Sequence, residues 1–184
     1  MKADKNKIII SILVICLFAI SFFFDKTIFL FIDLIENPVL DYILNIVSSY
    51  TFIFLIFFLA TLSLWKENKQ KIPLLWSSII ISTIITIILK VVVARARPFD
   101  ATIISILAFL NYSFPSLHSA TAFSIVPALD KFKWAWIILA IIIAISRIYL
   151  KVHYLSDVLF GAILGYLVGF GLIYLEKRYK IFKR

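Results

Sequence analysis

Long uncharged apolar runs constrain this chain more than any other feature of its sequence. Residues 8–24 form a run of 17 and residues 42–64 a run of 23, both without a charged side chain. Because about 20 apolar helical residues cross the hydrocarbon core of a bilayer, these runs predict membrane-spanning helices. Of the 184 residues, 63% are hydrophobic, against roughly half in a soluble domain. We therefore expect an integral membrane protein.

The remaining apolar stretches extend this pattern to six spans. We expect them at residues 8–24, 42–64, 72–93, 115–129, 134–145 and 158–175. Mixed polarity predicts short interfacial helices at residues 25–38 and 99–114. No small-residue cleavage site follows the first run, so we expect a retained span instead of a signal peptide. The sequence thus predicts one all-α domain over residues 1–184, an integral membrane bundle of six transmembrane helices with short interfacial helices.

The distribution of positive charge orients this predicted bundle. The formal net charge is +9. On a soluble protein, such a charge would suggest nucleic acid as a binding partner. With six spans, 13 of the 19 Lys and Arg residues lie on the side of both termini and 6 on the other side. Because cytoplasmic loops carry the excess of Lys and Arg, we expect cytoplasmic termini in the cell (plasma) membrane. A basic face against anionic lipid then accounts for the charge, and we expect no nucleic acid partner.

All four glycines of the chain lie in the sixth predicted span. Gly161, Gly165 and Gly169 are spaced by four, which places them on one face of a helix. Small residues at this spacing let two membrane helices approach closely. We expect this ridge to pack against neighbouring helices of the same subunit, and the alternative is a homodimer seam.

Three polar segments interrupt the apolar pattern, and the predicted topology brings them to the same extracytoplasmic side. They are residues 90–98, 115–118 and 146–157. Lys90 and Arg97 are seven residues apart, about two helical turns, and Arg147 lies in the third segment. A cluster of partly buried cations needs an anionic partner. Since Arg forms paired hydrogen bonds with phosphate and Lys supplies a point charge, these cations predict a phosphate site.

Histidines in the same segments add chemistry to the predicted phosphate site. His153 and Asp157 are four residues apart, so the carboxylate can orient one ring nitrogen while the other remains available as a nucleophile or base. The alternative is a helix start with Ser156 as N-cap and Asp157 in the first turn. With His118 as a second histidine, the site suggests phosphoryl transfer, in which one histidine attacks phosphorus and the other protonates the leaving oxygen.

The chain offers few ligands for a metal ion. Cys16 is the only cysteine and lies in the first apolar run, and the chain has two histidines. We therefore do not expect a metal site built on cysteines or on several histidines. We predict no metal and no cofactor, with fixed cations in the role that a metal ion plays in other phosphoryl-transfer sites.

Three motifs together resemble those of the type 2 phosphatidic acid phosphatase superfamily, a family of membrane lipid phosphatases. The pattern Lys-x6-Arg-Pro is met by Lys90, Arg97 and Pro98, Pro-Ser-x-His by Pro115, Ser116 and His118, and Ser-Arg-x5-His-x3-Asp by Ser146, Arg147, His153 and Asp157. They occur in order, within a six-span frame like that of the family. The resemblance implies a metal-independent lipid phosphate or pyrophosphate phosphatase.

The resemblance also implies a role for each motif residue. His153 would be the nucleophile that forms a phosphohistidine, Asp157 would orient it, and His118 would be the general acid. Phosphate would be bound by the backbone N–H of residue 117 and by Lys90, Arg97, Ser116 and Arg147. The family usually has glycine where this chain has Leu117, so the local geometry would differ if that position needs a conformation open only to glycine.

The expected substrate is a lipid phosphate at the outer leaflet, because the loops are too short to enclose a large soluble molecule. The short chain looks like the small polyprenyl pyrophosphate phosphatases, of the undecaprenyl or dolichyl type, that serve carrier-lipid recycling. Phosphatidate or phosphatidylglycerophosphate phosphatase is the alternative. Arg95 and Lys151 lie outside the motifs and could contact a second phosphate or lipid headgroups. Interpretations from other classes are an anion transporter and an inactive lipid-phosphate binder.

Overall fold

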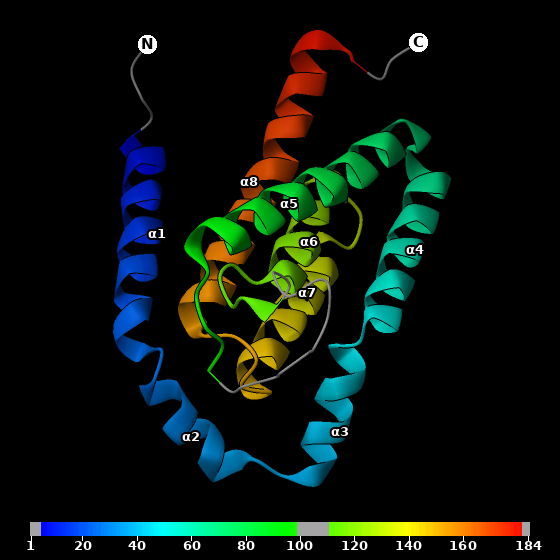
Figure 1. The fold of residues 1–184 in the computed structure, drawn as a ribbon. Coiled ribbons are helices and arrows are strands. Elements are labelled where there is room, and N and C mark those ends of the chain that lie inside the picture. Colours follow the sequence, from blue (N-terminus) through cyan, green and yellow to red (C-terminus); the bar gives the residue numbers. More distant parts are fainter. Residues whose placement is uncertain (1–4, 99–110, 182–184) are drawn as a thin grey trace.

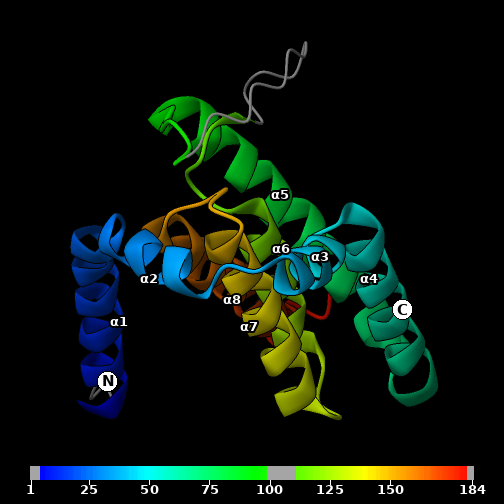
Figure 2. The same cartoon turned by 90° about the horizontal axis from the view of Figure 1, so that it is seen from below.

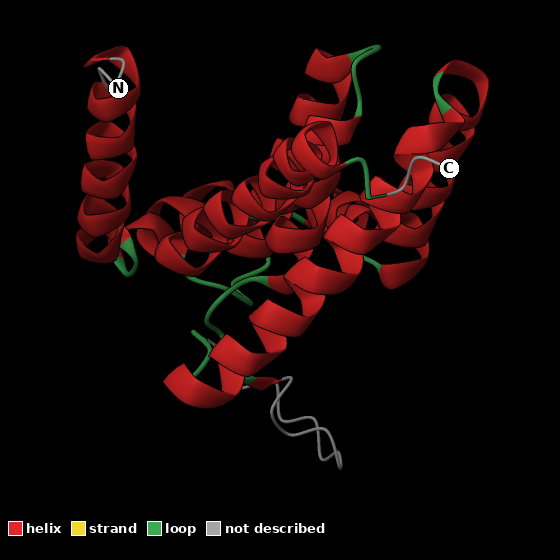
Figure 3. Ribbon diagram, turned by 90° about the horizontal axis from the view of Figure 1, so that it is seen from above, coloured by secondary structure: helices red, strands yellow, loops and turns green. Residues whose placement is uncertain are grey.

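In a computed structural model of the protein, the described residues are 5–98 and 111–181. All regular elements within them are helices (Figures 1 and 3). This result confirms the prediction of an all-α chain. The interfacial segment expected at residues 99–114 lies mostly outside the described residues.

The C-terminal part of the chain packs around one short central helix. This helix is α6 (Leu117–Ile125), continued by the 3-10 turn η3 (Val126–Ala128). Its sequence is rich in Ser and Ala, whose small side chains let neighbouring helices come close. The helices packed against it are α5 (Ile72–Val93), α7 (Lys133–Tyr149) and α8 (Leu155–Tyr179) (Figure 1).

Glycines of α8 allow its close approach to α6. A Cβ atom at Gly165 would lie 1.9 Å from the carbonyl oxygen of Ala120, and one at Gly169 would lie 2.1 Å from that of Ser124. No side chain fits at such distances, so the contact requires glycine. Gly161 also faces α6. The ridge therefore packs within the subunit, and α6 covers the face that a homodimer seam through these glycines would use.

The N-terminal third forms an outer frame around this core. α1 (Lys5–Phe24) ends at a sharp turn, and its part from Ile12 meets α2 (Thr27–Ile35) at 69°. α2 and α3 (Pro38–Val47) cross the base of the bundle, and α4 (Tyr50–Glu67) returns on the side opposite α1 (Figures 1 and 2). α1 begins and α8 ends at the same end of the molecule, away from α2 and α3 (Figure 1).

The second predicted span was wrong in its boundaries. The sequence predicts one helix over residues 42–64, whereas the chain breaks at Ser48 and Ser49, between α3 and α4. The Ser49 side chain accepts a hydrogen bond from the Phe52 N–H at 3.2 Å and so caps the start of α4. Both serines are uncharged, and hydropathy alone does not register such a cap.

Helix length decides which segments can cross a membrane alone. Among the described residues, three helices are long and apolar enough, and the bent pair of α1 and α2 makes a fourth if it counts as one span. α6 has 9 residues and α7 has 17, so these lengths do not confirm the predicted count of six. Many large apolar side chains are exposed on the outer helix faces, as contact with lipid requires.

Candidate active site

Segments that are distant in the sequence line one polar pocket. They are the end of α5 with the loop after it, the start of α6, the end of α7 with its connection to α8, and the start of α4. The lining residues are Tyr50, Lys90, Arg97, Leu117, His118, Arg147 and His153. The empty volume of the pocket is about 280 Å³. The structure therefore brings together residues from all three polar segments of the sequence.

Two cations of this pocket are buried against neutral oxygens. Lys90 is 2% exposed, and its Nζ donates to the carbonyl oxygens of Tyr112 and Ser113. Arg147 donates to the hydroxyl of Ser48, while its Nε is buried with no hydrogen-bond partner in the described part of the chain. No carboxylate in that part forms a salt bridge with either cation. Because a buried charge without a counterion is costly, the pocket is suited to an anion.

The loop after α5 and the start of α6 add donors to the same pocket. The Nε of Arg97 donates to the carbonyl oxygen of Asn111 at 2.9 Å. Ser116 is fully buried at the N-cap position of α6, and Leu117 is the first helical residue, whose N–H needs no intrahelical acceptor. Leu117 is not among the described residues with positive φ. A glycine-only conformation is therefore not needed here, and leucine can present its N–H to an anion.

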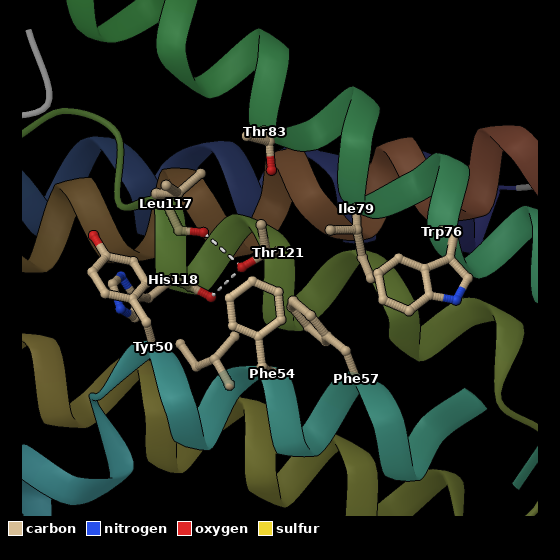
Figure 4. Close-up of a pocket in the computed structure, with 10 residues that line it drawn as sticks. Tyr50, Phe54, Phe57, Trp76, Ile79, Thr83, Leu117, His118 and Thr121 are labelled. Carbon is tan, nitrogen blue, oxygen red and sulfur yellow. Dashed lines mark hydrogen bonds between the residues drawn. The ribbon is translucent and has the colours of Figure 1, made fainter. Parts of the chain in front are cut away.

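Both histidines carry a buried ring nitrogen with no hydrogen-bond partner in the described residues. These atoms are Nε2 of His118 and Nδ1 of His153. The His118 ring packs against that of Tyr50, with 5.1 Å between centroids (Figure 4). Nδ1 of His153 lies 3.6 Å from Oδ2 of Asp157. This distance is too long for a hydrogen bond, but catalytic hydrogen bonds are often long before substrate binds.

Asp157 takes part in both arrangements that the sequence left open. It is the third residue of α8, and its Oδ2 accepts the Tyr154 N–H at 2.8 Å, which caps the helix. The same oxygen accepts the Ser113 hydroxyl and faces His153. His153 precedes the helix instead of lying on it, and the N-cap is Tyr154, not Ser156. The Asp157 carboxylate therefore both caps α8 and approaches the His153 imidazole.

The protonation state of His153 follows from its surroundings. His153 lies in the connection between α7 and α8 and is 2% exposed. Burial, together with the positive charges of Arg147 and Lys90, lowers the pKa of His153 to about 4, although Asp157 opposes the shift. At neutral pH the ring is therefore uncharged and keeps a nitrogen lone pair for nucleophilic attack.

Arg95 and Lys151 do not line this pocket. Arg95 forms salt bridges with Asp25 and Asp157, each at 2.7 Å. Lys151 forms salt bridges with Asp33 at 2.5 Å and Glu36 at 2.8 Å. The structure thus places both side chains against carboxylates, three of which belong to the N-terminal third, and not in the polar pocket.

An apolar groove adjoins the polar pocket between α4, α5 and α6 (Figure 4). Its empty volume is about 550 Å³. Tyr50, Leu117 and His118 line both the groove and the pocket. The rest of the lining consists of Ile53, Phe54, Phe57, Trp76, Ile79, Thr83 and Thr121. The apolar groove and the polar pocket therefore meet at Tyr50, Leu117 and His118.

Several side chains around the site were not predicted from the sequence. Tyr50 lies in an uncharged run and looks like any other aromatic residue at a membrane interface. Ser48 and Ser113 are single hydroxyls that contact Arg147 and Asp157. Asp25 was assigned to an interfacial segment, although its side chain is buried. The position of Ser113, two residues before the second motif, is the one signal that could have suggested a contact.

The pocket and the groove together define a membrane protein that handles a lipid phosphate. The sequence profile of the PAP2 superfamily matches residues 70–180, a region that contains every motif residue named above. The chain therefore belongs to the PAP2 superfamily, as the motifs indicated.

Three known proteins illustrate the relationship. The bacitracin transport permease protein BcrC of Bacillus licheniformis is 30% identical over 142 residues, which cover 72% of this chain and 70% of the relative. The undecaprenyl-diphosphatase BcrC of Bacillus subtilis (strain 168) is 28% identical over 143 residues, which cover 73% and 74%. The crystal structure of a transmembrane PAP2 type phosphatidylglycerolphosphate phosphatase from Bacillus subtilis superposes with a TM-score of 0.70 at 22% identity. It covers 94% of this chain and 98% of that one, which shows a shared fold.

These similarities confirm two predictions from the sequence. The apolar helices and the transmembrane neighbour show that this chain is a membrane protein. Membership of the PAP2 superfamily and the phosphatases among its relatives show that it is a lipid phosphatase, a hydrolase.

Proposed function

We propose that this protein hydrolyses a polyprenyl pyrophosphate, of the undecaprenyl or dolichyl type, to the monophosphate for carrier-lipid recycling. The observation that carries the proposal is the junction of the polar pocket and the apolar groove at His118. The pocket offers cations and two histidines, and the groove accepts a hydrocarbon chain. A relative with the name undecaprenyl-diphosphatase supports this choice of substrate.

The proposed reaction consists of two displacements at the terminal phosphorus. Nε2 of His153 attacks that phosphorus while its bond to the bridging oxygen breaks, which gives a phosphohistidine and a polyprenyl phosphate. His118, whose protonated form is favoured by the negative charge of the bound substrate, donates a proton to the leaving oxygen. Water then attacks the phosphohistidine, His118 accepts its proton, and inorganic phosphate leaves. Asp157, which faces Nδ1, stabilises the positive charge that develops on the His153 ring.

Fixed donors stabilise the charge of the phosphoryl group in this mechanism. Lys90, Arg97 and Arg147 bind its oxygens, and the Ser116 hydroxyl and the Leu117 N–H complete the site. Each preorganised donor of this kind typically contributes about 10²–10³-fold to turnover. Because side chains supply the positive charge, we expect activity to persist in the presence of a chelator.

We place the pocket on the extracytoplasmic side of the plasma membrane, within one domain over residues 1–184. The excess of Lys and Arg near the termini supports cytoplasmic termini. The shared end at which α1 begins and α8 ends supports the same arrangement (Figure 1). The substrate phosphate would then come from the outer leaflet.

A second candidate substrate is phosphatidylglycerophosphate, or phosphatidate, because the groove accepts acyl chains as well as prenyl chains. The name of the similar solved structure favours this candidate. The name of the permease relative corresponds instead to the transport interpretation. Transport of an anion would not require a histidine beside a carboxylate, so we do not adopt the transport interpretation.

Phosphate release by purified protein in detergent tests the proposed function. Undecaprenyl pyrophosphate, phosphatidylglycerophosphate and phosphatidate are compared as substrates, with and without EDTA. We expect release in EDTA, fastest with the pyrophosphate, and loss of release in His153→Ala. Asp33→Asn is the matched control, since it removes a carboxylate that is about half exposed and pairs with Lys151, which does not line the pocket.

The possible results separate the candidates. Faster release from phosphatidylglycerophosphate would replace the proposed substrate and leave the mechanism intact. Release that persists in His153→Ala would overturn the phosphohistidine mechanism. Release that stops with EDTA and returns with an added divalent cation would overturn the role given to the fixed cations.

A further inference from the structure

A buried carboxylate outside the pocket ties the N-terminal third to the start of α8. Asp25 lies in the turn between α1 and α2 and is 3% exposed, whereas Asp residues are seldom fully buried unless they are paired. Its Oδ1 accepts the Ser156 N–H at 2.8 Å. Its Oδ2 accepts the Ser156 hydroxyl at 2.6 Å and the Arg95 guanidinium at 2.7 Å. Both oxygens of Asp25 therefore accept hydrogen bonds from the start of α8 or from Arg95.

Arg95 connects Asp25 to Asp157. Its second terminal nitrogen donates to Oδ1 of Asp157 and to Oγ of Ser156, each at 2.7 Å. The guanidinium carbon also lies 4.0 Å from the centroid of the Tyr154 ring, a cation–π contact. The two carboxylates, the hydroxyl and the ring together hold Arg95 in one orientation.

This bridge determines which oxygen of Asp157 faces His153. Arg95 engages Oδ1, so Oδ2 is the oxygen that lies 3.6 Å from Nδ1 of His153. Ser113 and the Tyr154 N–H donate to the same Oδ2 and fix its position. Rotation of the Asp157 carboxylate would break the contact with Arg95, so the bridge limits that rotation.

The bridge also sets the charge behind the nucleophile. Asp25, Arg95 and Asp157 together carry a charge of −1, and without the Asp25 carboxylate they would be neutral. The His153 ring becomes positive when it attacks phosphorus, and a negative cluster in a buried site stabilises that positive charge more than a neutral one. Asp25 therefore bears on the reaction although it does not touch the pocket.

We propose that Asp25 is a positioning residue for phosphoryl transfer, which acts through Arg95 to orient Asp157 and to keep negative charge behind His153. The inference rests on the proposed phosphohistidine mechanism. Asp25 lies outside residues 70–180, the region that matches the PAP2 superfamily. The motifs of the family therefore do not reveal it.

Steady-state kinetics of the purified full-length protein provide the first test. Asp25→Asn keeps the shape of the side chain and removes its charge, and Asp33→Asn removes another paired carboxylate of the same N-terminal third. We expect kcat to fall about tenfold or more in Asp25→Asn, as is typical when an orienting partner is lost. KM and inhibition by inorganic phosphate should stay near wild type because the pocket is intact, and Asp33→Asn should leave both constants unchanged. If Asp25→Asn does not fold, Arg95→Lys keeps the charge but loses the two-armed bridge, and the same fall in kcat is expected.

A spectroscopic readout separates positioning from a merely structural role. The chain has two histidines, so a His118→Gln background leaves His153 as a single ring for nitrogen-15 NMR. We expect Asp25→Asn to shift the His153 ring resonances in that background, and Asp33→Asn to leave them in place. This measurement needs no turnover, so it stands even if the proposed function fails.

Each result bears on one of the two proposals. Wild-type kcat and unchanged His153 resonances in folded Asp25→Asn would overturn the positioning role. Equal losses in Asp25→Asn and Asp33→Asn would also overturn it, because they would indicate general destabilisation. Activity that persists in His153→Ala would instead refute the proposed phosphohistidine mechanism, and the NMR comparison would still decide whether Asp25 orients the ring.

Discussion

Two groups of basic side chains lie near the active site, and they differ in what neutralises them. Lys90 and Arg147 line the pocket and donate to neutral oxygens. Arg95 and Lys151 form salt bridges with carboxylates, most of them from the N-terminal third. Nearby acidic residues, and not the presence of Lys or Arg alone, therefore decide which cations are available to a substrate phosphate.

Among the basic side chains near the site, removal of a pocket cation should have the largest effect on activity. We expect Arg147→Met to lower kcat/KM by about 10²–10³-fold, because the phosphoryl group loses a preorganised donor. The unfolding temperature should stay the same or rise, since a buried charge with no carboxylate partner is removed. Phosphate release and thermal unfolding in the same detergent measure both effects. Normal turnover with a lower unfolding temperature would show that Arg147 has a structural role, like Arg95 and Lys151.

Removal of Arg95, a paired cation, should lower stability in addition to the loss of kcat expected above. We expect Arg95→Met to lower the free energy of unfolding by about 3 kcal/mol, because Asp25 and Asp157 remain as buried carboxylates without their shared partner. Thermal or denaturant unfolding in detergent measures the loss. The double variant Asp25→Asn with Arg95→Met should recover part of it, because one uncompensated charge is gone. Strictly additive losses would contradict this account of the pairing.

Lys151 should show a much smaller effect than Arg95. Its partners Asp33 and Glu36 have side chains that are 55% and 45% exposed, and exposed ion pairs contribute about 1 kcal/mol or less. We expect Lys151→Met to change stability by no more than that. Turnover should stay within about twofold of wild type. A rise in KM confined to pyrophosphate substrates would instead make Lys151 a contact for the second phosphate.

The charge state of His153 should not change across neutral pH. Because burial lowers its pKa to about 4, the ring is neutral above that pH and becomes protonated, and so loses its nucleophilic nitrogen, only as the pH falls through about 4. Nitrogen-15 NMR of the His118→Gln variant measures this titration directly. A midpoint near the usual value of about 6.5 would mean that the ring is solvated and that the pocket is less closed than the structure shows.

Local patterns in the sequence predicted the helical membrane class and the three segments that meet at the pocket. Uncharged runs are visible residue by residue, and the motifs of Lys90, His118 and His153 fall at the edges of such runs. The pairing of Asp25 with Arg95 could not be predicted in the same way, because it joins residues 70 positions apart. Sequence periodicity carries no information about such a contact.

The break between α3 and α4 could not be predicted from the sequence for a different reason. Ser48 and Ser49 are uncharged, so they continue an apolar run by hydropathy, and the cap depends on one side-chain hydrogen bond. The two interpretations of Asp157 could not be separated either, because the sequence contains the residues for both. The structure shows that the helix cap and the approach to His153 coexist.

The contact of Asp25 with Arg95 and Ser156 has a consequence for how far this protein can be divided. Residues 70–180 contain all three family motifs, yet one carboxylate of the buried network is supplied from the turn between α1 and α2. A chimera that joins this region to the N-terminal third of a relative without a matching acid would leave Arg95 with one carboxylate partner instead of two. Residues 70–180 therefore cannot be exchanged between relatives as an independent unit. Substitutions at positions 25 and 95 should be tolerated only when both positions change together.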